Sequence, residues 1–110
     1  MAIDFSKLSE TELIELKLEH LYWKFEDKFG SPYRKYDESI VSNNLRVTEF
    51  LKELVAAIER FKDLDKINQE VLDLLEDENF HTLCLAIEIA QGKTTITDNL
   101  YRYDRRSEIY

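Results

Sequence analysis

The stretch SETELIELKLEHLYWKFEDKFGSP, residues 9–32, decides the fold class, because it contains the start, the body and the end of one long helix. Ser9 followed by Glu12 is a capping box, in which the serine oxygen accepts from a first-turn amide and the glutamate reaches back. Gly30 supplies a left-handed stop, and Pro32 prevents continuation. We therefore predict a helix that begins after Ser9 and ends before Gly30.

This first helix has two apolar stripes, whereas a surface helix needs only one. The first stripe, which we expect to face the core, consists of Ile14, Leu18, Leu21, Phe25 and Phe29. The second stripe, centred roughly 140° around the helix at 100° per residue, consists of Leu13, Leu16, His20 and Trp23. We interpret the second stripe as a partner or dimer surface. Internal packing against the C-terminal tail or residues 33–43 is the alternative.

The rest of the chain also favours helices, because two Gly and one Pro are too few for the turns of a β-sandwich. Residues 33–43 are predicted to form a loop. Farther along, the apolar stripe changes phase, which indicates a break near residues 76–79, with Asn79 capping the next helix and Gly92 ending it. After the first helix, the predicted helices cover about residues 44–63, 66–77 and 80–91.

These elements predict an all-α fold: a compact antiparallel bundle of about four helices over residues 1–92. Residues 93–110 form a C-terminal extension that packs against the bundle or docks on a partner. The alternative is an α+β fold with a C-terminal hairpin around residues 83–97, where Leu83 to Ile89 also alternate as in a strand. We favour helix, because the segment is apolar on all sides, as in a buried helix.

Several function classes are disfavoured by what the sequence lacks. Cys84 is the single cysteine and cannot form an internal disulfide. There is no signal-peptide pattern and no apolar run near the roughly 20 residues that span a bilayer, so we expect a cytoplasmic protein without a membrane partner. No serine or cysteine is placed beside an oriented base, and no zinc-ligand pattern is present. We expect no enzyme activity, no metal and no cofactor.

The charge pattern suits a basic partner, since the chain has a net charge of −8. Residues 63–78 contain seven acids and one base. Within them, Glu70, Asp73 and Asp77 share one helix face by their three- and four-residue spacing. We interpret this acidic face as a second candidate partner surface, and a merely solvated face is the alternative.

In size, acidity and helix count, the chain resembles the small inhibitor, immunity and antitoxin proteins, which bind a basic protein. That resemblance implies a non-enzymatic acidic protein-binding module, with a homodimer through the second stripe left open. The alternative function is a nucleic-acid-associated factor, which the acidic body disfavours. Its candidate residues interleave aromatic and basic side chains: Tyr33, Arg34, Lys35, Tyr36, Tyr101, Arg102, Tyr103, Arg105 and Arg106.

Overall fold

The computed structural model describes residues 7–33 and 37–104, and within these ranges the regular structure is helical, without a strand. The elements are α1 (Glu10–Phe29), α2 (Ile40–Glu59), the 3-10 turn η2 (Leu64–Lys66), α3 (Gln69–Asp77), α4 (His81–Ala90), the 3-10 turn η3 (Thr97–Asn99) and α5 (Tyr101–Asp104). The predicted all-α fold is confirmed. The alternative hairpin around residues 83–97 is wrong, because most of that segment belongs to α4 and η3.

Helix α1 has the predicted bounds and the predicted capping box. The Glu12 amide donates to Ser9 Oγ at 3.1 Å, and the Ser9 amide donates to Glu12 Oε1 at 3.1 Å. At the other end Gly30 has a φ of 82°, and its amide donates to the Glu26 carbonyl at 2.8 Å. Local interactions therefore define both ends of this helix.

Helix α2 begins at Ile40, earlier than the predicted start at residue 44, and it ends at Glu59, earlier than the predicted end at 63. Ser39 is its N-cap, with its Oγ accepting from the Ser42 amide at 3.1 Å. The side chain of Asn43 is buried in the helix, and its Nδ2 donates to the Tyr103 carbonyl at 3.4 Å. Asn43, in a segment predicted as a loop, thus fits a helix, because a distant segment accepts a hydrogen bond from its side chain.

The predicted break between the third and fourth helices is confirmed, but Asn79 does not cap α4. Asn79 has a φ of 66°, a left-handed conformation that ends α3. The next amide, that of Phe80, donates back to the Leu75 carbonyl at 2.9 Å. Phe80 itself occupies the N-cap position of α4, without a side-chain cap. Helix α3 starts later than predicted, because Asn68 caps it by accepting from the Val71 amide at 3.2 Å.

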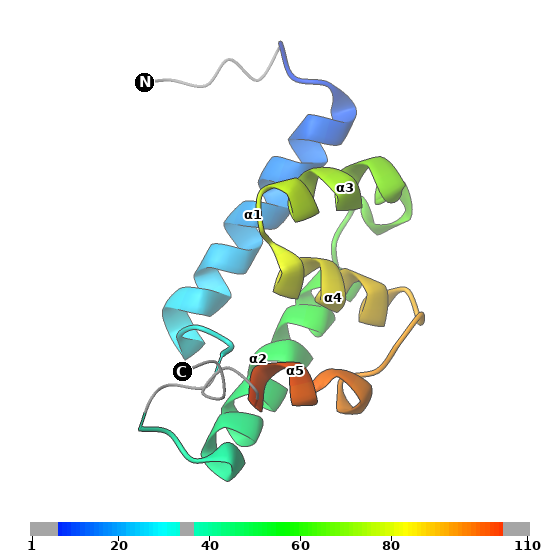
Figure 1. The fold of residues 1–110 in the computed structure, drawn as a ribbon. Coiled ribbons are helices and arrows are strands. Elements are labelled where there is room, and N and C mark those ends of the chain that lie inside the picture. The colour runs from blue at the N-terminus through cyan, green and yellow to red at the C-terminus, as the bar shows by residue number, and fades with distance from the viewer. Residues whose placement is uncertain (1–6, 34–36, 105–110) are drawn as a thin grey trace.

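The two long helices, α1 and α2, run in opposite directions, and the shorter helices lie across them (Figure 1). Helix α3 contacts α1, α4 contacts α2, and α5 packs against α2 near its beginning. Contacts between α3 and α4 and between α1 and α4 close the domain. Within the described ranges, no helix is long and apolar enough to cross a bilayer.

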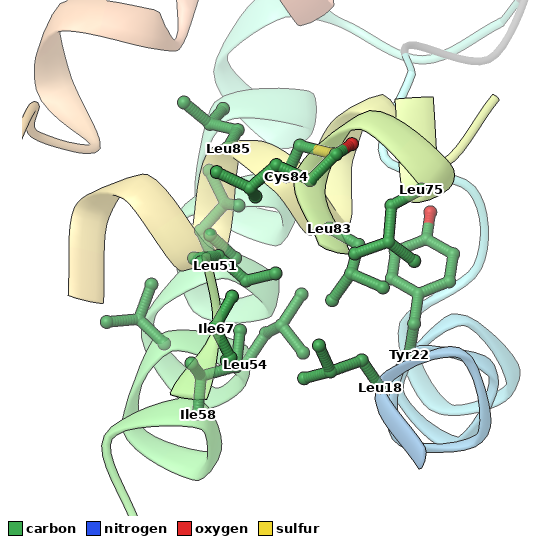
Figure 2. Packing of buried hydrophobic residues seen from close by; sticks show 14 of the residues in the cluster. Leu18, Tyr22, Leu51, Leu54, Ile58, Ile67, Leu75, Leu83, Cys84 and Leu85 are labelled. Atoms are coloured by element: carbon green, nitrogen blue, oxygen red, sulfur yellow. The ribbon is translucent and has the colours of Figure 1, made fainter. Parts of the chain in front are cut away.

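Helix α4 lies in the middle of the core, and its residues from Thr82 to Ile87 are all buried. Figure 2 shows side chains of α1, α2 and α3 converging on it, among them Leu18, Leu54 and Leu75. Because α4 is covered on more than one side, it has no polar stripe. This is the physical reason for the apolar composition that the sequence shows between residues 82 and 90. Gly92, with a φ of 79°, follows the end of α4 as predicted.

The connection between α1 and α2 is held by one arginine of α2. The Arg46 guanidinium pairs with both carboxylate oxygens of Glu38, at 3.0 and 2.8 Å. It also donates to the carbonyls of Phe29 at 3.3 Å, of Tyr33 at 3.1 Å and of Ser31. This side chain therefore satisfies the carbonyl of the last residue of α1 and two carbonyls of the connection that follows it.

Candidate functional site

One face of α1 carries a row of carboxylates, which we call the acidic row: Glu12, Glu15, Glu19 and Glu26. At 100° per residue these four positions lie within about 60° of one another. The lysines of α1 lie on nearly the opposite side of the helix. Two of them, Lys17 and Lys28, pair with Asp63 at 3.4 Å and with Glu53 at 3.0 Å.

The charges of α1 are thus segregated by function. Two of the three lysines on one side, Lys17 and Lys28, form ion pairs within the domain. Within residues 7–33 and 37–104, by contrast, no ion pair involves a carboxylate of the acidic row. The acidic row therefore presents uncompensated negative charge beside the α3–α4 turn.

A hollow of about 480 Å³ lies between α1 and this turn, and we call it the acidic pocket. It is lined by Glu19, Tyr22, Trp23 and Glu26 of α1 and by Glu78, Asn79 and Phe80 of the turn. Asn79, in its left-handed conformation, belongs to the turn that lines the pocket opposite α1. The site thus combines three carboxylates, three aromatic rings and one amide.

The three rings of the acidic pocket pack edge to face. The ring centroids of Trp23 and Phe80 lie 5.5 Å apart at an interplanar angle of 74°, and the ring centroid of Tyr22 lies 5.7 Å from each of theirs. Tyr22 is buried, Phe80 is half-buried and Trp23 is 48% exposed. Such pairs each contribute about 0.5–1.5 kcal/mol beyond area burial. A half-exposed indole is therefore held in place by two neighbours.

The negative potential of this face is visible in the protonation of Glu15. Burial first, then a hydrogen bond with Glu19 and the charges of Glu19, Glu78 and Glu12, together raise the pKa of Glu15 from 4.5 to about 7. The pKa of Tyr22 is also raised, first by burial and then by hydrogen bonding to Glu26. Carboxylates that repel one another in this way favour a cation beside them.

Of the second apolar stripe, Trp23 lines the acidic pocket, whereas Leu13 and Leu16 are half-buried and His20 is exposed. The two leucines thus offer less apolar surface than the helical pattern alone suggests. Apolar side chains with a larger exposed fraction lie at the start of α2, where Val41 is 71% and Leu45 is 67% exposed.

The predicted acidic face on α3 is exposed at all three positions. Asp73 accepts from Gln69 Nε2 at 2.9 Å, Glu70 accepts weakly from Thr11 at 3.5 Å, and Asp77 completes the face. Asp77 directly precedes Glu78, which lines the acidic pocket. The two acidic surfaces adjoin along the chain.

The residues predicted for nucleic-acid binding are only partly described. Arg34, Lys35, Tyr36, Arg105 and Arg106 lie outside the described residues. The Tyr33 and Tyr103 rings meet at 5.2 Å, so the fold brings the two segments together. Tyr103, however, is buried, and its hydroxyl donates to Thr82 Oγ1 at 3.2 Å. Tyr103 therefore has no open ring face for a base, whereas Tyr101 and Arg102 are exposed.

The single cysteine has the environment of a core residue. Cys84 is buried, and its thiol donates to the Leu72 carbonyl at 3.7 Å. Burial, followed by the charges of Glu76 and Glu88, raises its pKa to about 12, so the thiolate is not formed near neutral pH. Over the described ranges, no group of three or more His, Cys, Asp or Glu side chains is arranged to hold a metal ion.

The sequence pattern contains only half of the acidic pocket. The three- and four-residue spacing of the acidic row around Trp23 is visible in the sequence and indicates one shared face. The pairing of that face with Glu78 and Phe80 depends on how α3 crosses α1 (Figure 1). Fold and site define an all-α protein with an acidic, aromatic surface pocket. Comparisons with protein-family models, curated proteins and solved structures find no match.

Proposed function

We propose that this chain is a non-enzymatic acidic protein-binding module, which binds a basic protein through the acidic row and the acidic pocket. The observation that carries the proposal is the segregation of charge on α1. Lys17 and Lys28 on one side pair within the domain, whereas Glu19 and Glu26 on the other side line a pocket with the half-exposed Trp23. Such a surface supplies both steering charge and an aromatic anchor.

The electrostatics of the site favour a cationic partner over a neutral one. Burial raises the pKa of Glu15, and repulsion by the nearby charges of Glu19, Glu78 and Glu12 adds to this effect. Cations of a partner would relieve that repulsion, so part of the binding free energy comes from strain already present in the free protein. The acidic face of α3 extends the negative surface and would speed encounter at low ionic strength.

Two further readings stay proposals. A homodimer through Leu13, Leu16, His20 and Trp23 would use the same tryptophan, and it competes with partner binding at that site. A nucleic-acid-associated role would rely on Tyr101, Arg102 and the residues outside the described ranges. We favour the basic partner, because only the acidic pocket combines an open aromatic ring with charge that the described part of the chain leaves uncompensated.

The test is affinity capture from extract of the source cells, with charge-reversed bait. Glu19→Lys combined with Glu26→Lys should reduce capture of basic proteins by about ten-fold or more, since each replaces attraction with repulsion at the interface. The control bait carries Glu49→Lys and Glu59→Lys, which change the net charge equally at exposed positions of α2. Circular dichroism verifies that both baits fold.

The comparison of the two baits decides the proposal. If the Glu19→Lys/Glu26→Lys bait captures fewer basic proteins while the control bait still captures them, the proposed function is supported. Equal capture by the two variants would refute a role for this face, because net charge alone would then explain binding.

A further inference from the structure

We infer that the acidic pocket receives one arginine side chain of the basic partner, with the guanidinium stacked on Trp23 and hydrogen-bonded to Glu19, Glu26 and Glu78. This inference rests on the proposed function and adds the chemistry of the residue that is recognised.

The lining matches the two recognition properties of a guanidinium group. Its plane stacks on an aromatic face, and its five N–H donors spread over several acceptors at once. Trp23 offers an open ring, while carboxylates stand on both sides: Glu19 and Glu26 from α1, and Glu78 from the turn. A lysine ammonium would gain the charge but not the stacking or the bidentate geometry.

The size of the hollow is compatible with this occupant. A volume of about 480 Å³ has room for one extended arginine side chain. The edge contacts from Tyr22 and Phe80 hold the indole in position before binding, which lowers the ordering cost of recognition.

A second hollow shows what happens where the chain supplies its own cation. This site, of about 250 Å³, is lined by Glu10, Thr11, Ile14, Asp65, Lys66 and Asn68. There Lys66 pairs with Glu10 at 2.9 Å, so its acids are already compensated, and its lining contains no aromatic ring. Among the described residues, the lining of the acidic pocket includes no lysine or arginine, and it contains the aromatic rings of Tyr22, Trp23 and Phe80.

The experiment uses nona-arginine and nona-lysine peptides of equal charge, titrated at low salt into the full chain. Trp23 is the single tryptophan, so selectively excited fluorescence reports on this pocket. We expect both peptides to bind, the arginine peptide about five-fold more tightly, in keeping with the strength of a cation–π contact. We also expect the arginine peptide alone to change the tryptophan emission strongly.

Two variants separate the pocket from general charge attraction. Trp23→Leu should lower the affinity for nona-arginine to that for nona-lysine, while Trp23→Phe should preserve part of the preference. These affinities are measured by calorimetry, since the fluorophore is removed. Should Trp23→Leu fail to fold, the double variant Glu19→Gln and Glu26→Gln keeps the reporter and should abolish the arginine preference.

The outcomes for the inference and for the proposed function differ. Equal affinity of the two peptides, with unchanged tryptophan emission, overturns the arginine site, even if both peptides bind more weakly to Glu19→Lys/Glu26→Lys. That last result would still support the basic partner. If neither peptide binds at low salt, the proposed function fails and the arginine site fails with it.

Discussion

Replacing Arg46 with alanine should lower the free energy of unfolding more than any other single charge deletion in the described part of the chain. The guanidinium makes a bidentate pair with Glu38 and donates to the carbonyls of Phe29, Ser31 and Tyr33. It therefore joins the end of α1 to the body of α2. The substitution removes all of these bonds together.

The expected magnitude follows from burial. The Arg46 and Glu38 side chains are only 17% and 11% exposed. Removing one partner of a buried ion pair costs about 3–5 kcal/mol. Because water reaches both groups in part, we expect the lower end, about 3 kcal/mol. For a chain of this size the melting temperature should fall by about 12 °C.

Urea and thermal unfolding, followed by far-UV circular dichroism, measure this change. Arg60→Ala is the matched control, because Arg60 is exposed and should cost less than about 0.5 kcal/mol. Arg46→Lys should recover only a minority of the loss, since an ammonium cannot form the bidentate pair. A loss below about 1 kcal/mol for Arg46→Ala would refute the view that this network holds the connection together.

Three further predictions concern protonation, accessibility and backbone conformation. Folding raises the pKa of Glu15, so the folded state binds this proton more tightly than the unfolded state does. The contribution of Glu15 to the free energy of unfolding is therefore fully present below pH 4.5 and is lost as the pH rises through about 7. Glu15→Gln should therefore raise the free energy of unfolding at pH 8 by about 1 kcal/mol, after allowance for solvent screening, with no gain at pH 4 in the same urea titrations. Cys84 should react with DTNB only as fast as the core opens, and a rapid reaction in native buffer would contradict its burial. Asn79→Gly should be neutral or slightly stabilising, whereas Asn79→Ala should cost about 1 kcal/mol, because alanine resists the left-handed conformation; equal melting temperatures for the two would argue against that conformation.

The candidate site was only half visible in the sequence. The acidic row and Trp23 share a face of α1 by helical spacing, which any helical projection shows. Glu78 and Phe80 join them through the packing of α3 on α1, for which no local signal exists. The second apolar stripe predicted a partner surface that includes Leu13 and Leu16, but both leucines are half-buried in the folded domain.

By itself, the sequence determined the all-α class, both ends of α1, the break after α3 and the buried character of α4. These features depend on interactions between near neighbours: the capping box of Ser9 and Glu12, the glycine stops and the period of the apolar residues.

Only the tertiary structure decided where α2 begins, what Asn79 does and where the acidic pocket lies. Asn43 fits into α2 because its side-chain amide donates a hydrogen bond to the backbone carbonyl of Tyr103, far along the chain. Asn79 takes a left-handed conformation and ends α3 instead of capping α4. The burial of Asn43 and the lining of the acidic pocket depend on groups that are distant in sequence and adjacent in space, so no window of the sequence contains the free energy that determines them.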